Sequence, residues 1–188
     1  MISGLYYIPN YLTQEETTEI ENYLLQSKDW FGITKNKNSR RVIHFGYSYS
    51  YDRSGIKKIK DIPSIFKNII IPERINQIIN TDLIKNNMDQ LIINEYKPGQ
   101  GIAAHIDHEK FFGPIIICLT VFSGTEINFI NKFNDLDVKT IRVEPRSLYI
   151  MSGDARYKYK HEICHRIEDH GIKRGTRISL TYRSVINT

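Results

Sequence analysis

The chain has 188 residues, 40% of them hydrophobic, which is enough for one domain with a sizeable core. No apolar run approaches the roughly 18 residues of a membrane-spanning helix, and the start lacks the features of a signal peptide. The two cysteines do not make a disulfide framework, so we expect a cytoplasmic or otherwise intracellular protein with no membrane partner. The net charge of +5 permits nucleic-acid binding without requiring it.

The N-terminal third predicts two helices separated by a polar segment. Thr13 and Glu16 match a capping box, and the helix that they begin is expected to continue to about Ser27. Residues 30–60 combine charged and aromatic side chains that suit a lid over a site. A second helix is expected to open at Pro72. Its predicted buried face consists of Ile75, Ile78 and Ile79.

From Leu91 onward the sequence predicts short strands separated by turns. Many short strands with such turns favour a jelly roll, whose mouth is a natural place for a ligand. The turns are expected at Pro98-Gly99-Gln100-Gly101, Ser123-Gly124 and Ser152-Gly153-Asp154. The strands are expected at about 90–96, 115–122, 125–131, 138–143, 147–151, 157–161 and 176–185.

Several of these strands sort their residues by parity, because successive residues of a strand point to opposite faces. The strand at 176–185 places polar residues on one face and apolar residues on the other. A buried face lined with arginines is costly unless something charged binds there. The alternative is an edge strand with a wet face. The polar face consists of Arg177, Ser179, Thr181 and Arg183; Asn94 and Tyr96 share a face of their strand, as do Tyr157, Tyr159 and His161.

The triplet His105-Ile106-Asp107, followed by His161, is the most informative pattern in the chain. Two imidazoles and one carboxylate can occupy one face of an octahedral iron, as in non-haem Fe(II) oxygenases, and leave the other face for a co-substrate and O₂. A downstream arginine supplies a planar fork for a carboxylate. The triplet alone is a weak indication, and His165 competes with His161 as the distal ligand. Cys164 is a less suitable ligand because this chemistry prefers nitrogen and oxygen donors.

Taken together, these motifs resemble the AlkB family of dioxygenases over nearly the whole chain. Within the family they are most similar to the subgroup that hydroxylates a tRNA wobble uridine. The motifs that carry the resemblance are Asn94-x-Tyr96, His105-x-Asp107, His161, the polar face of the strand at 176–185, and the stretches 40–47, 94–102 and 146–148.

The resemblance implies a mainly β fold with bracing helices: a double-stranded β-helix (jelly-roll) core at about 90–185 and a nucleotide-recognition lid at about 30–60, in one domain spanning 1–188. It implies that His105, Asp107 and His161 bind Fe(II), with 2-oxoglutarate and O₂ as co-substrates. It also implies that Arg177 pairs with the distal carboxylate of 2-oxoglutarate. The remaining oxygens would be held by Asn94, Tyr96, Ser179 and Arg183.

Basic and aromatic residues alternate in the expected lid. Aromatic side chains that stack a base, flanked by cations that hold phosphates, suit single-stranded or flipped nucleotides. The alternative is a solvated surface with ordinary strand tyrosines. The basic runs are Lys35, Lys37, Arg40 and Arg41, then Lys57, Lys58 and Lys60, around Phe45, Tyr47, Tyr49 and Tyr51. The candidate substrate contacts are Arg40, Arg41, Tyr47, Tyr49 and His108, the last standing where repair-type members of the family carry acidic residues.

The sequence therefore predicts a monomeric Fe(II)/2-oxoglutarate-dependent dioxygenase that oxidatively demethylates alkylated bases in tRNA, other RNA or single-stranded DNA. One alternative is hydroxylation of a modified tRNA wobble uridine. Another is a catalytically dead nucleic-acid-binding scaffold, against which the intact triad and both arginines argue.

Overall fold

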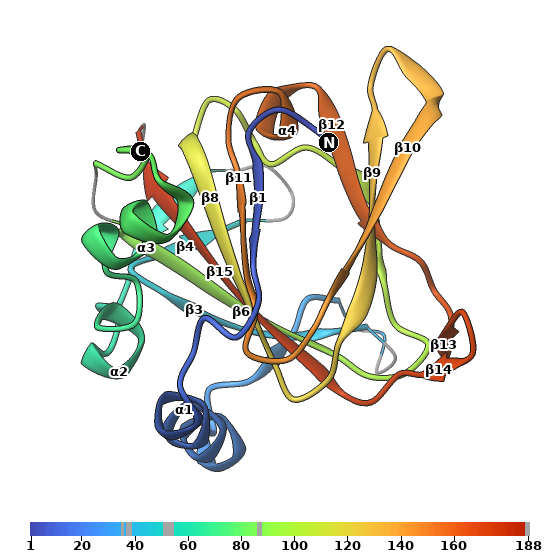
Figure 1. Cartoon of the computed structure of the whole chain (residues 1–188). Helices are drawn as coiled ribbons and strands as arrows, with labels where there is room; N and C mark the ends of the chain where they lie inside the picture. The colour runs from blue at the N-terminus through green and yellow to red at the C-terminus, as the bar shows by residue number, and fades with distance from the viewer. Residues whose placement is uncertain (35, 37–38, 51–54, 86–87, 187–188) are drawn as a thin grey trace.

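Two antiparallel β-sheets face each other in this computed structural model, which describes residues 1–34, 36, 39–50, 55–85 and 88–186 (Figure 1). The larger sheet is ordered β1 (Leu5–Ile8), β11 (Leu148–Met151), β8 (Phe112–Val121), β15 (Arg177–Val185), β6 (Gln90–Tyr96), β3 (Arg41–Phe45), β2 (Phe31–Gly32). The smaller sheet is ordered β10 (Asn134–Val143), β9 (Thr125–Asn131), β12 (Tyr159–Ile163), β7 (Ile102–His105). This arrangement is the mainly β jelly-roll core that the sequence predicts.

Two short hairpins and four helices complete the fold of the described residues. The hairpins pair β4 (Tyr47–Tyr49) with β5 (Ile56–Lys58) and β13 (Glu168–Asp169) with β14 (Ile172–Lys173). The helices are α1 (Gln14–Gln26), α2 (Ser64–Lys67), α3 (Pro72–Ile79) and α4 (Gly153–Tyr157). In the part of the chain that the structure describes, no helix has the length and apolar character needed to span a membrane.

The larger sheet separates two hydrophobic cores. On its outer face, β15 contributes Leu180 and Tyr182 to a core that also contains residues of α1, α2 and α3. The helices contribute Ile20, Leu24, Phe66 and Ile75. Between the two sheets lies a second core, which includes Ile116, Phe129 and Tyr149. The polar residues of β15 point to this inner side, so β15 is a central, buried strand and not a wet edge.

Helix α1 begins and ends where the sequence predicts. The Thr13 hydroxyl accepts from the backbone N–H of Glu16 at 3.1 Å, and the Glu16 carboxylate accepts from the N–H of Thr13 at 2.8 Å. The two contacts form the expected capping box. In α3, Ile75 is buried as expected, but Ile78 is 51% exposed, so the predicted buried face is too wide.

Two predictions about the β region are wrong, and some strands were missed. The segment at 152–154 begins helix α4 and is not a turn. Consequently Tyr157 ends a helix, and only Tyr159 and His161 belong to one strand. Strands β1 and β7 were not predicted at all, although β7 carries His105.

The expected lid at 30–60 is partly core. Strand β3 pairs with β6 inside the larger sheet, and Phe45 at its end is 1% exposed, so this aromatic cannot stack on a base. Of the described residues here, those of the β4–β5 hairpin form a separate two-stranded unit. Lys35, Lys37 and Tyr51 lie outside the described residues.

Candidate active site

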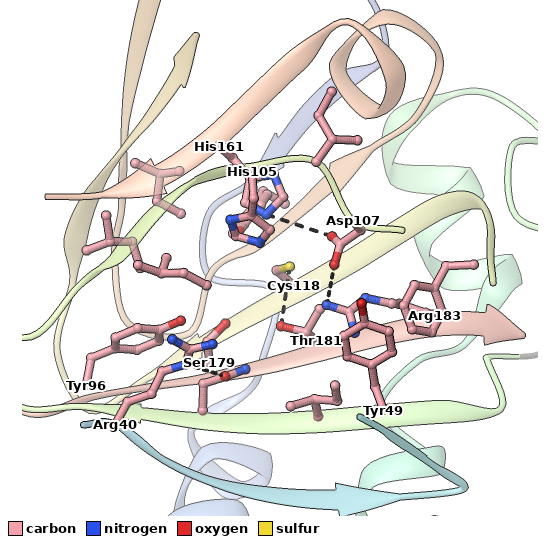
Figure 2. Close-up of a pocket in the computed structure, with 18 of the residues that line it drawn as sticks. Arg40, Tyr49, Tyr96, His105, Asp107, Cys118, His161, Ser179, Thr181 and Arg183 are labelled. Atoms are coloured by element: carbon pink, nitrogen blue, oxygen red, sulfur yellow. Dashed lines mark hydrogen bonds and ion pairs between the residues drawn. The ribbon is translucent and has the colours of Figure 1, made fainter. Parts of the chain in front are cut away.

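A cavity of about 190 Å³ lies between the two sheets. The larger sheet provides its arginine-lined wall through β15 and β6, and the smaller sheet provides two histidines (Figure 2). Every residue predicted to bind metal or co-substrate borders this one cavity. These residues are Asn94, Tyr96, His105, Asp107, His161, Arg177, Ser179 and Arg183.

The two histidines face each other across neighbouring strands. His105 ends β7 and is directly opposite His161 in β12, which explains why their ring centroids are 4.3 Å apart. Nδ1 of His105 lies 2.8 Å from the carbonyl oxygen of Ala103, so Nε2 of that ring is the atom left for a ligand bond. Nε2 of His161 is 3.8 Å from Oδ2 of Asp107.

The two carboxylate oxygens of Asp107 have different surroundings. Oδ1 is 2.6 Å from a terminal guanidinium nitrogen of Arg183. Oδ2 is buried and accepts no hydrogen bond in the described residues. Burial alone would raise the pKa of Asp107. The nearby charges of Arg183 and of the two histidines lower it by more, so the resulting pKa is about 2. The group is therefore a carboxylate at neutral pH.

His161 is held neutral. Burial is the main cause that lowers its pKa, the neighbouring His105 adds to the effect, and the resulting pKa is about 3. A neutral imidazole and an ionised carboxylate are the protonation states that metal ligation requires.

These donors suit Fe(II), although they do not yet converge on one point. As the side chains stand, no group of three His, Cys, Asp or Glu residues in the described ranges is arranged to hold an ion. The buried Oδ2 of Asp107 accepts no hydrogen bond within the described ranges, and a bound ion would satisfy it.

Arg177 forms the polar floor of the cavity. Its side chain is 3% exposed, one Nη donates to Thr120 at 3.0 Å, and its Nε finds no hydrogen-bond partner among the residues that the structure describes. The guanidinium carbon lies 5.7 Å from the ring centroid of Tyr96. A buried guanidinium with an unsatisfied N–H is placed to bind an anion.

Arg40 and Tyr49 border the cavity at different places (Figure 2). Nε of Arg40 donates to the side-chain oxygen of Asn94 at 3.1 Å. The ring centroid of Tyr49 lies 5.7 Å from that of Phe112 and 6.4 Å from that of Phe111. His108 also lines the cavity, and its ring centroid lies 4.4 Å from that of Phe111.

Other predicted residues lie elsewhere. Arg41 binds the carboxylate of Glu95 through two contacts of 2.7 and 2.6 Å, and its guanidinium lies 5.3 Å from the Trp30 ring. Tyr47 lines a separate cavity of about 500 Å³. His165 is exposed and does not border the active-site cavity, in contrast to His161.

Sequence reasoning missed Arg156. Its side chain is 2% exposed and donates to the carbonyl oxygens of Asp107, Phe112 and Gly113 at 2.9, 3.4 and 3.3 Å. It therefore fixes the loop that carries the carboxylate ligand candidate. Because the sequence predicted a turn just before Arg156, nothing in the pattern indicated that this arginine is buried.

Comparison with known proteins identifies the family. Residues 4–183 match the 2OG-Fe(II) oxygenase superfamily. The chain belongs to this superfamily. It is an AlkB-type dioxygenase, which uses Fe(II), 2-oxoglutarate and O₂.

Named relatives of this AlkB-type dioxygenase include longer proteins. The tRNA (carboxymethyluridine(34)-5-O)-methyltransferase ALKBH8 of Macaca fascicularis is 35% identical over 208 residues, which cover 96% of this chain and 31% of that protein. The alkylated DNA repair protein ALKBH8 homolog of Arabidopsis thaliana is 32% identical, over 99% of this chain and 59% of that protein. The uncharacterized protein L905 of Acanthamoeba polyphaga mimivirus is 34% identical, over 98% and 86%. The chain thus spans about a third of the macaque relative.

Solved structures confirm the fold of the AlkB-type dioxygenase. The structure of OsALKBH1 matches with a TM-score of 0.75 at 13% identity and covers 98% of this chain and 99% of that one. A 2OG-Fe(II) oxygenase from Burkholderia pseudomallei matches with a TM-score of 0.67 at 13% identity, over 96% and 84%.

Proposed function

We propose that His105, Asp107 and His161 hold Fe(II) and that the protein oxidises a modified base of a nucleic acid. The observation that carries the metal assignment is the buried Oδ2 of Asp107, which accepts no hydrogen bond from the described residues and lies 3.8 Å from Nε2 of His161. His105 lies opposite His161 on the neighbouring strand, and its Nδ1 already contacts the carbonyl oxygen of Ala103. Arg156 fixes the backbone of Asp107 through its carbonyl oxygen.

The floor of the cavity suits 2-oxoglutarate. Arg177 is a buried cation that matches the distal carboxylate, and Asn94, Tyr96 and Ser179 offer further polar contacts beside it. When bound, Fe(II) with 2-oxoglutarate and O₂ supplies an oxidation that places hydroxyl on a substrate carbon and releases succinate and CO₂. The surrounding strands bind and orient the reactants and exclude water.

The rim of the cavity suits a flat, polar substrate. Tyr49 and His108 offer aromatic faces on which a base can stack, and Arg40 offers a cation. The ring of Phe111 contacts both aromatic rings. The names of the relatives support a nucleic-acid substrate, since the macaque protein is named for carboxymethyluridine(34) of tRNA and the Arabidopsis protein for alkylated DNA repair. A reducing, intracellular compartment would keep the iron ferrous.

Two products are distinguishable. Hydroxylation of a tRNA wobble uridine leaves a stable alcohol, and the relatives named for carboxymethyluridine(34) of tRNA favour a tRNA uridine as the substrate. Demethylation of an alkylated base releases formaldehyde, and a DNA N6-methyl adenine demethylase of Caenorhabditis elegans, 24% identical over 195 residues, favours it.

Nucleoside mass spectrometry tests the proposal. The protein is incubated with Fe(II), 2-oxoglutarate and either total tRNA or methylated single-stranded DNA. A gain of one oxygen on a tRNA uridine indicates hydroxylation, and loss of a methyl group with formaldehyde release indicates demethylation. The His161→Ala protein is the control. No change in either polymer, from a protein that does convert 2-oxoglutarate, would contradict a nucleic-acid substrate.

A further inference from the structure

The β4–β5 hairpin is tied to the core at its base. The N–H of Gly46 donates to the carbonyl of Lys60 at 2.7 Å, and the N–H of Ile59 donates to the carbonyl of Gly46 at 2.9 Å. Gly46 has a φ of +73°, and a Cβ there would lie 1.8 Å from the carbonyl oxygen of Asp89. Only glycine fits this approach, so the hairpin begins directly against the start of β6.

From this point a line of two hydrogen bonds and one ion pair leads to the carboxylate of Asp107. The carbonyl of Tyr47 accepts from Nε2 of Gln90 at 3.2 Å. Oε1 of Gln90 accepts from one terminal nitrogen of Arg183 at 3.1 Å. The other terminal nitrogen of Arg183 lies 2.6 Å from Oδ1 of Asp107, as Figure 2 shows.

Gln90 is suited to transmit position through this line. It is 0% exposed, so water cannot replace either contact. One amide orientation satisfies both neighbours, because the oxygen must face the guanidinium and the NH₂ group must face the carbonyl. Buried polar groups are costly to leave unpaired, so a shift at one end of the line is resisted at the other.

We propose that Gln90 is a positioning residue that couples the β4–β5 hairpin to the metal-binding carboxylate. The coupling rests on the proposed roles of Asp107 and of the hairpin. Arg183 sets the rotation of the Asp107 carboxylate, and Gln90 sets Arg183. The same hairpin carries Tyr49 at the cavity rim. Because coupling is reciprocal, metal binding stabilises the hairpin, and the hairpin position in turn affects metal affinity.

The test measures binding and exchange without turnover. Mn(II) and 2-oxoglutarate are added to the full chain in the absence of O₂. Mn(II) affinity is measured by calorimetry, and hydrogen exchange is followed at residues 47–49 and 56–58. In the wild type, the ligands are expected to slow exchange in both strands of the hairpin.

Two substitutions distinguish the contact of Gln90 with Arg183 from its contact with the carbonyl of Tyr47. Gln90→Met keeps the volume but removes both hydrogen bonds, so it should weaken Mn(II) binding about tenfold and abolish the ligand-induced protection. Gln90→Glu keeps an acceptor for Arg183 but places an oxygen against the carbonyl of Tyr47. It should keep Mn(II) affinity within about threefold and still lose the protection of the hairpin.

Ile93→Val is the matched control, because Ile93 is a fully buried residue of β6 on the opposite face. It should retain wild-type Mn(II) affinity and protection. Ligand-induced protection that persists in both Gln90 variants would overturn the coupling, as would a wild-type hairpin that the ligands do not protect. A wild type that binds no Mn(II) would instead overturn the proposed metal site, and the coupling with it. If Gln90→Met does not fold, Gln90→Glu decides.

Discussion

Single residues in the cavity have separate tasks that follow from their neighbours. Asp107 offers one oxygen to Arg183, and its other oxygen accepts no hydrogen bond from the described residues, whereas His161 is largely buried and its pKa is lowered. Arg177 donates to Thr120 and lies near the ring of Tyr96, at the end of the cavity where we propose that 2-oxoglutarate binds. The metal ligands and the co-substrate anchor can therefore be tested independently.

The distal metal ligand is tested by a pair of histidines. His161→Ala should remove most Mn(II) or Fe(II) affinity, because it deletes a donor from the cavity. His165→Ala should bind metal like the wild type, since His165 is exposed and outside the cavity. Metal titration followed by calorimetry makes the comparison, with circular dichroism to confirm folding. The reverse ranking of the two variants would reassign the ligand.

The co-substrate anchor is tested at Arg177. Losing one partner of a desolvated charge pair costs about 2–5 kcal/mol, so Arg177→Ala should weaken 2-oxoglutarate binding by roughly one and a half to nearly four decades. Arg177→Lys should recover only part of the loss, because an ammonium cannot reproduce the planar fork. Binding of 2-oxoglutarate to the Mn(II)-loaded protein is the measurement. Equal affinity in Arg177→Ala and the wild type would refute the assignment.

At this scale, parity predicted much of the site. Alternation along β15 placed Arg177 and Arg183 on one buried face, as the structure shows. Parity places Gln90 on the same face as Asn94 and Tyr96, but it could not predict that Gln90 contacts the carbonyl of Tyr47 and the guanidinium of Arg183. Nor could it find Arg156, whose partners are backbone carbonyls brought close only by the fold. Such tertiary partners leave no periodic pattern in the sequence.

Elements explain why neighbouring arginines differ. Arg40 borders the cavity, whereas Arg41 binds Glu95 and lies over Trp30, so one step along the chain changes the side on which the guanidinium lies. The sequence predicted a lid for the whole of 30–60 because its charges and aromatics resemble a surface. Strand β3 nevertheless enters the larger sheet, since its apolar residues complete both faces of that sheet.

The two arginines give a matched comparison. Arg40→Gln should weaken binding of single-stranded RNA and reduce the slope of log affinity against log salt by about one if it contacts a phosphate. Arg41→Gln should leave RNA affinity unchanged and lower the free energy of unfolding by about 1 kcal/mol, because its ion pair is partly exposed. Filter binding over a salt series distinguishes them. Equal losses of RNA affinity in the two variants would show that Arg41 contacts the RNA, as the sequence predicted.

Helix α4 shows a second limit of prediction at the scale of elements. The glycine at position 153 has a φ of +47°, and the sequence Ser152-Gly153-Asp154 is typical of a turn. Five residues are too few for a helical pattern to be recognised. In the structure, Arg156 of this helix donates hydrogen bonds to backbone carbonyls of the loop at 107–113, and such tertiary contacts cannot be recognised in the sequence.

For the whole molecule, buried histidines predict a dependence of stability on pH. Burial is the main cause that lowers the pKa of His44, nearby Arg183 adds to it, and the resulting pKa is about 4. Between about pH 6.5 and pH 4 the unfolded chain binds this proton and the folded protein does not, so stability falls as pH falls. His44→Asn should reduce the slope by at most about 1.4 kcal/mol per pH unit in that window.

Urea unfolding of the metal-free protein measures this effect. The wild type should lose stability steadily as the pH falls through the window, and His44→Asn should lose less. His161 contributes in the same direction, because its pKa is also lowered, so some slope should remain in the variant. Identical slopes for the two proteins would show that His44 titrates alike in the folded and unfolded chains.

The central claim is that this cavity is a working dioxygenase site. Succinate formation from 2-oxoglutarate, measured with Fe(II) and O₂ but no added substrate, tests it most directly. The wild type should form succinate slowly, faster when the correct nucleic acid is added, and Asp107→Ala should form none. Succinate formation that is absent from the iron-loaded wild type, or equally fast in Asp107→Ala, would contradict the assignment of the site.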